Sequence, residues 1–163
     1  MKLTPLLCGT AAAATLLWAN AANAELYQFA ISGDYSATWQ LDTDKAPTAV
    51  YPGVSFYYLG VGGLFPDSTW GTADIYFRNS SQGGGLFIVD SGPNSPLVLS
   101  SGPQLYSGSE ADFDFVVGTH VLTEAMGPGS YTLTISAVPE PATYGMMLAG
   151  LGLVGVALRR RQS

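Results

Sequence analysis

The sequence predicts an all-β fold: a single β-sandwich or jelly-roll-like domain, flanked by an N-terminal signal peptide and a C-terminal transmembrane helix. Short stretches in the interior alternate between apolar and polar residues with a period of two. Glycine- and proline-rich turn signals separate these stretches, and the two long apolar segments lie at the ends of the 163-residue chain. The interior, residues 25–137, is long enough for one hydrophobic core and is expected to form one domain.

The N-terminal 24 residues have the three parts of an export signal. Lys2 supplies a positive charge, residues 6–19 form an apolar core, and Ala22 and Ala24 frame an A-x-A cleavage site. Cleavage after Ala24 would leave Glu25 as the first residue of the mature chain. The alternative is an anchor that is never cut, which the short apolar core and the small-residue site disfavour.

The predicted strands of the interior share a clean in-out alternation or a short apolar run. Four of them alternate, at residues 35–42, 73–78, 112–115 and 131–137, and four further strands are expected at residues 26–31, 54–59, 86–89 and 97–99. Because one face of each alternating strand is polar, the strands favour a sandwich with a solvated outer surface. No pattern with a helical period appears between the two ends.

Turns and loops are predicted between these strands. The signals are Ser32-Gly33-Asp34, Pro52-Gly53, two Ser-Gly-Pro tripeptides at residues 91–93 and 101–103, and Gly127-Pro128-Gly129. Two glycine runs are also interpreted as loops. The run at residues 60–63 lacks the third glycine and the helix of a dinucleotide site, and the run at residues 83–85 has no Lys-Ser or Lys-Thr partner for a phosphate.

The interior is strongly acidic. Between Glu25 and Val138 only Lys45 and Arg78 are basic, against eleven acidic residues, which gives a net charge of −9. This charge opposes binding to nucleic acids and to anionic membrane surfaces. The only cysteine, Cys8, lies in the predicted signal peptide, so the mature domain is expected to fold without a disulfide.

The residues that catalysis or a cofactor would need are sparse. His120 is the only histidine, and its H-x-x-x-E spacing with Glu124 lacks the second histidine of a zinc site. There is also no G-x-S-x-G nucleophile elbow. We therefore expect a protein that is not an enzyme and uses no cofactor, with His120 as a surface or packing residue.

Two acidic pairs leave alternatives open. Asp42 and Asp44 stand two residues apart at a strand end, where oxygen-rich Ca²⁺ sites form, although Lys45 follows and no Gly-then-Glu completion appears. Asp112 and Asp114 point the same way on one strand. Solvated acids, a calcium site and acid/base catalysis are all compatible with these pairs, and solvated acids are the simplest interpretation.

Aromatic residues are the other candidate for binding. Six of them cannot all face one core: Tyr51, Phe56, Tyr57, Tyr58, Trp70 and Tyr76. Exposed rings would stack on sugars, whereas the alternative is that strands are naturally rich in aromatic residues and that the core takes most of these rings. Contiguous exposure of Trp70 with the tyrosines on one concave face would favour sugar binding.

The C-terminal segment is predicted to cross a membrane. Residues 142–158 carry no charge and are mostly Leu, Val, Met, Ala or Gly. As a helix they would extend about 25 Å, slightly less than the ~30 Å hydrocarbon core of a bilayer. Arg159, Arg160 and Arg161 follow at once, so the positive-inside rule places the C-terminus in the cytoplasm and the interior domain outside. The alternative is a buried helix of a globular domain, which the terminal arginines disfavour.

This tail resembles the PEP-CTERM sorting signal of Gram-negative bacteria. The resemblance rests on Val138-Pro139-Glu140-Pro141, on the glycine-rich apolar span and on the arginines, and covers residues 138–161. It implies that exosortase, a membrane-embedded peptidase or transpeptidase, recognises Val138, Pro139, Glu140 and Pro141 and cuts near them. It further implies that residues 142–158 anchor the precursor in the inner membrane and that the arginines stop its transfer. Residues 34–44 are similar to a strand pattern of some exported proteins that carry this signal.

Three classes of function stay open for the interior domain. The first is a structural protein of the cell surface or extracellular matrix, associated with exopolysaccharide or a biofilm, as the resemblance implies. The second is a carbohydrate-binding module for exopolysaccharide. The third is a secreted hydrolase, which requires a cleft with converging carboxylates.

Overall fold

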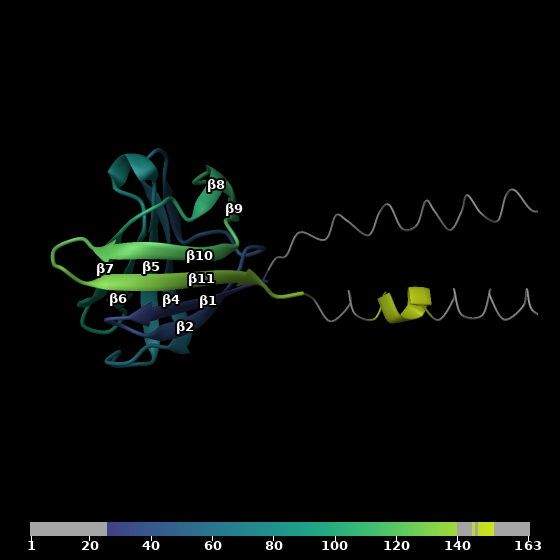
Figure 1. Ribbon diagram of the computed structural model, residues 1–163, viewed down its shortest axis with the longest axis horizontal. Coiled ribbons are helices and arrows are strands. Elements are labelled where there is room, and N and C mark those ends of the chain that lie inside the picture. The colour runs from purple at the N-terminus through teal and green to yellow at the C-terminus, as the bar shows by residue number, and fades with distance from the viewer. Residues whose placement is uncertain (1–25, 140–144, 146, 152–163) are drawn as a thin grey trace, which may run out of the picture.

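The computed structural model describes residues 26–139, 145 and 147–151, and the first of these ranges forms an all-β domain (Figure 1). In this range a single turn of 3-10 helix, η2 (Ser80–Gln82), separates two of the strands. The strands are β1 (Leu26–Gly33), β2 (Ala37–Asp42), β3 (Ala49–Tyr51), β4 (Ser55–Leu64), β5 (Thr72–Arg78), β6 (Leu86–Asp90), β7 (Pro96–Ser101), β8 (Tyr106–Ser109), β9 (Asp112–Phe115), β10 (Gly118–Glu124) and β11 (Ser130–Ala137).

The main sheet closes on itself into a barrel of eight strands. Its order is β2-β1-β11-β10-β7-β6-β5-β4-β3, and an additional pairing of β2 with β4 completes the ring. All these pairs are antiparallel, and around the ring the strands follow one another in chain order. β3 is attached outside the ring to the edge of β4, and β8 and β9 form a separate hairpin between β7 and β10.

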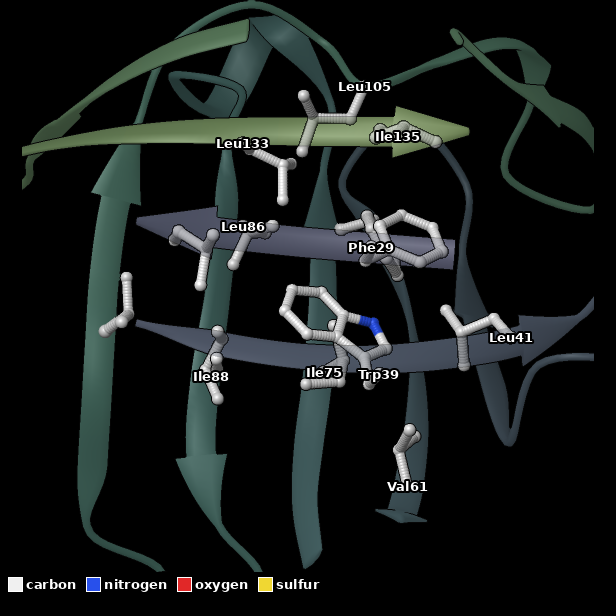
Figure 2. Packing of buried hydrophobic residues seen from close by; sticks show 14 of the residues in the cluster. Phe29, Trp39, Leu41, Val61, Ile75, Leu86, Ile88, Leu105, Leu133 and Ile135 are labelled. Atoms are coloured by element: carbon white, nitrogen blue, oxygen red, sulfur yellow. The ribbon is translucent and has the colours of Figure 1, made fainter. Parts of the chain in front are cut away.

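The all-β prediction is confirmed, but the sandwich or jelly-roll prediction is not. A jelly roll needs Greek-key crossovers, whereas each strand of this ring pairs with its neighbours in an up-and-down order. The ring is held at two narrow seams, β7–β10 and β2–β4, with two residue pairs each. Between these seams β1 and β2 run across the strands of the opposite half, as Figure 2 shows, so the two halves pack in a crossed rather than an aligned arrangement.

Aromatic and branched side chains fill the interior of the ring. Trp39 is 2% exposed and lies between two rings: its centroid is 5.1 Å from that of Phe29 and 5.8 Å from that of Phe65. Figure 2 shows that strands from both halves contribute the side chains around Trp39 and Phe29, namely Leu41, Val61, Ile75, Ile88 and Leu133. An eight-stranded ring is narrow enough for side chains to fill, so this core holds both halves of the sheet together.

The strands predicted from a clean alternation are present, and their apolar residues face the interior as expected. Buried positions recur at every second residue of β2, β5 and β11. The prediction of a loop at residues 60–63 is wrong, because these residues lie inside β4. Gly60 has a φ of 64° beside a register shift between Tyr58 and Val61, which is the geometry of a bulge that glycine permits.

Strands β3, β8 and β10 were not predicted. The burial pattern of β10 explains this, because Leu122 is its only buried residue and no alternation is visible in the sequence. β3 has three residues and lies between Pro47 and Pro52. Short or solvated strands such as these are recognised only from their partners in the sheet.

Several predicted features lie outside the described residues. These are the signal peptide with Ala22, Ala24 and Glu25, the motif residues Glu140 and Pro141, and the arginines Arg159, Arg160 and Arg161. Of the predicted span 142–158 the structure describes residues 145 and 147–151, all of which are helical. Within the described part of the chain, no helix has both the length and the apolar character needed to span a bilayer.

Candidate functional site

The two described ends of the domain lie side by side at one edge of the sheet. β1 and β11 are antiparallel neighbours, with Tyr27 opposite Ala137. The last sheet hydrogen bond runs from the backbone N–H of Val138 to the carbonyl oxygen of Leu26, at 2.8 Å. The chain therefore enters and leaves the domain at the same place, on the right of the domain in Figure 1.

The predicted sorting motif begins where this sheet pairing ends. Val138 is half-buried and still paired, whereas Pro139 is exposed and has no backbone N–H with which to extend the ladder. An enzyme that reads an extended peptide from Pro139 onward therefore need not unfold β11. The first motif residues are held at a fixed point next to the start of the domain.

In the candidate calcium pair, both side-chain oxygens of Asp42 already have partners within the same turn. Asp42 Oδ1 accepts a hydrogen bond from the backbone N–H of Asp44 at 3.1 Å, and Asp42 Oδ2 lies 3.3 Å from Nζ of Lys45. Lys45 thus supplies the cation that balances Asp42. No group of three or more His, Cys, Asp or Glu side chains suited to a metal occurs among the residues that the structure describes.

A buried carboxylate that the sequence did not single out is Glu110, which is 6% exposed at the tip of the β8–β9 hairpin. It accepts hydrogen bonds from the backbone N–H of Gly53 at 2.9 Å, from Asn79 Nδ2 at 2.6 Å and from the Tyr106 hydroxyl at 2.8 Å. These bonds, the one from Gly53 most strongly, lower the pKa of Glu110 to about 2. The ionised Glu110 fastens the hairpin to the ring.

Asp90 is a second buried carboxylate that accepts hydrogen bonds from loops, at the other end of the barrel. Burial raises the pKa of Asp90, but hydrogen bonds from Gly92, Thr69 and Ser68 outweigh burial and lower it below its ordinary value. Its donors come from the β4–β5 loop and from the turn after β6. Both buried carboxylates are therefore saturated with neutral donors and hold loops in place.

Asp112, Asp114 and His120 lie apart from these two carboxylates. Asp112 and Asp114 are exposed on β9, as expected for solvated acids. His120 lies on β10, and its Nε2 is 2.8 Å from the carbonyl oxygen of Val116. This is a local contact four residues back along the chain.

The six candidate aromatic residues divide between the inside and the outside of the ring. Phe56 and Tyr58 belong to the core. Tyr51, Tyr57 and Tyr76 form an outer row on β3, β4 and β5, with centroids 6.2 Å and 4.8 Å apart. The ring planes of Tyr57 and Tyr76 are tilted by 39° to one another. Trp70 is 69% exposed on the β4–β5 loop and makes none of the ring contacts found among the described residues, so no ring contact joins Trp70 to this row of tyrosines.

Comparison with known proteins identifies the C-terminal segment. A family model described as the PEP-CTERM protein-sorting motif matches residues 137–161. No curated protein and no solved structure matches this chain. The matched segment starts at the last residue of β11, where the chain leaves the sheet. The motif implies an exported, membrane-anchored precursor that exosortase processes, and the chain is a protein that carries the PEP-CTERM sorting motif.

Proposed function

We propose that this chain is a non-enzymatic structural protein that is exported, held briefly in the inner membrane and then freed or transferred by exosortase. Its destination is the cell surface or the extracellular matrix, in association with exopolysaccharide. The observation that carries the proposal is the PEP-CTERM motif at residues 137–161, directly after the last strand.

The fold supports this proposal in two ways. The domain meets both flanking segments at one edge, because Leu26 and Val138 are hydrogen-bonded neighbours. Before the signal peptide is removed, a domain tethered through both ends to one membrane therefore needs no crossing of the chain over its own surface. The closed ring also survives a cut after Val138, because every strand residue lies before that point.

Replacement of Pro139-Glu140-Pro141 by three alanines tests the sorting step. The variant precursor is expected to stay in the inner membrane at full length, because the peptidase loses the segment that it reads. Cell fractions and the medium are compared by immunoblotting, with Pro93→Ala as a control that changes an exposed proline of the β6–β7 turn. Release of the triple variant into the medium at the wild-type size and rate would show that the motif does not direct sorting.

A further inference from the structure

One outer face of the barrel carries no charged side chain inside its rim. It consists of the outward-facing residues of β1, β2, β10 and β11, the four strands that form one half of the ring (Figure 1). We name it the hydroxyl face, and its members are Gln28, Ala30, Ser32, Thr38, Gln40, Thr119, Val121, Thr123, Thr132, Thr134 and Ser136. Asp42 and Asp34 stand at its rim, where Asp42 is paired with Lys45 and Asp34 accepts a hydrogen bond from the backbone N–H of Ser130.

The side chains of the hydroxyl face are in register across the strands. Thr119 lies opposite Thr134, which lies opposite Ala30, and Ala30 lies opposite Thr38. The hydroxyl oxygens of Thr119 and Thr134 are 3.4 Å apart. Thr38 in turn lies opposite Leu64 across the β2–β4 seam. A continuous row therefore runs from β10 to the seam.

At the seam the row ends in an open hollow of about 260 Å³, lined among others by Gln28, Thr38, Gln40, Gly62 and Leu64. Gln28 is fixed there: its Nε2 donates to the carbonyl oxygens of Trp39 and Phe29 at 3.0 and 3.1 Å, and its Oε1 accepts from Gln40 Nε2 at 2.9 Å. Gln40 keeps its Oε1 and its second amide hydrogen free of bonds to the described residues. Leu64, 74% exposed, supplies an apolar side to the hollow.

We propose that the hydroxyl face binds a neutral polysaccharide, with the hollow at the β2–β4 seam as its main subsite. Threonine hydroxyls and glutamine amides both donate and accept hydrogen bonds, and sugar hydroxyls do the same. Leu64 offers contact for the C–H groups of a sugar ring. This inference rests on the proposed extracellular location, because the ligand must meet the exported domain.

The negative charge of the domain favours a neutral polysaccharide over a nucleic acid or an anionic polysaccharide as the ligand. The domain has a net charge of −9, so its overall field repels a nucleic acid or an anionic polysaccharide. A second copy of the chain would bring the same negative charge. Protein partners are anchored mainly by Trp, Tyr and Arg, whereas the hydroxyl face has none of these and is rich in threonine and serine, which rarely dominate such interfaces.

The proposal is tested on the full chain in detergent micelles. Its binding to immobilised cellohexaose, laminarihexaose and maltohexaose is measured, with polygalacturonate as the anionic polymer. Two variants place a negative charge on the face, Gln40→Glu in the hollow and Thr134→Glu in the middle of the row. The matched control is Gln82→Glu, which adds the same charge on the exposed η2 turn of the other half. Thermal unfolding of each variant confirms that the domain is folded.

We expect at least one neutral hexasaccharide to bind the wild type and Gln82→Glu equally, and both face variants at least about tenfold more weakly. The proposal is overturned if no neutral sugar binds, if only polygalacturonate binds, or if folded Gln40→Glu and Thr134→Glu bind like the wild type. A dimer in sedimentation that Thr134→Glu dissociates would also overturn it, since a second copy would then cover the face. Each of these results leaves the sorting experiment, which reads release from the membrane, unaffected.

Discussion

At the scale of single residues, two buried carboxylates hold the loops of this barrel. Glu110 and Asp90 both lie among neutral donors rather than beside a cation. Neither could be singled out from the sequence, because the partners are distant along the chain: Gly53 lies 57 residues before Glu110, and Thr69 lies 21 residues before Asp90. The sequence could point only to acidic pairs that are close in the chain, such as Asp42 and Asp44.

Glu110 makes stability depend on pH in a defined window. Its pKa is about 2 in the folded domain, below the ordinary value of 4.5, so its contribution is full above about pH 4.5 and is lost as the pH falls towards 2. In Glu110→Gln one accepting oxygen is replaced by an amide N–H, which then faces a hydrogen-bond donor and cannot accept from it. We therefore expect a loss of about 1–3 kcal/mol in the free energy of unfolding at pH 7.

Urea unfolding of the wild type and Glu110→Gln at a series of pH values measures this difference. The two curves are expected to converge between pH 4.5 and 2, whereas Asp112→Asn, which alters an exposed carboxylate of the same hairpin, should follow the wild type throughout. A Glu110→Gln difference that is constant with pH would refute the role given to the ionised carboxylate.

The contacts of Asp42 lead to a second prediction at this scale. Because its two oxygens already serve the Asp44 N–H and the Lys45 ammonium group, excess EDTA should leave the Tm of the domain unchanged. Differential scanning calorimetry with EDTA and with added Ca²⁺ measures this. A clear fall of Tm in EDTA, restored by Ca²⁺, would instead establish a calcium site.

At the scale of the strands, closure depends on a glycine that allows two strands to approach. A Cβ at Gly63 would lie 2.6 Å from the carbonyl oxygen of Thr38, 2.7 Å from the Phe65 ring and 2.9 Å from Cβ of Trp39. A Cβ at the neighbouring Gly62 would meet nothing within 4 Å. The two glycines look alike in the sequence, and only the strand packed against one of them separates their roles.

This contrast gives a matched pair of variants. Gly63→Ala overpacks the β2–β4 seam and should cost about 1–3 kcal/mol. Gly62→Ala should leave stability equal or slightly higher, because alanine restricts the unfolded chain more than glycine does. Urea unfolding compares the two with the wild type. Equal stability of the two alanine variants would show that the seam does not require the close approach at Gly63.

Local sequence patterns reveal strands that bury every second residue and miss strands that do not. β2, β5 and β11 were predicted because each buries every second residue, and alternation is a local signal. β10 was missed because it buries only Leu122. The glycines of β4 were interpreted as a loop because a bulge and a close approach leave the same local signal as a turn.

At the scale of the whole molecule, ring closure and the meeting of the two ends are long-range properties. β1 pairs with β11 from the opposite end of the domain, and β2 pairs with β4 at only two positions. Neither pairing has a sequence signal, which is why alternating strands and frequent turns suggested a sandwich or jelly roll. The sorting motif, in contrast, is a contiguous segment, and the sequence alone was sufficient to recognise it at residues 138–161.

The folded barrel is exported and sorted by its C-terminal signal. The intact mass of the protein recovered from outside the cells tests it most directly. We expect a chain that begins at Glu25 and ends near Pro139-Glu140-Pro141, with or without an attached group, and that lacks the arginines at residues 159–161. A mass that retains the segment from residue 142 to residue 163 would contradict it.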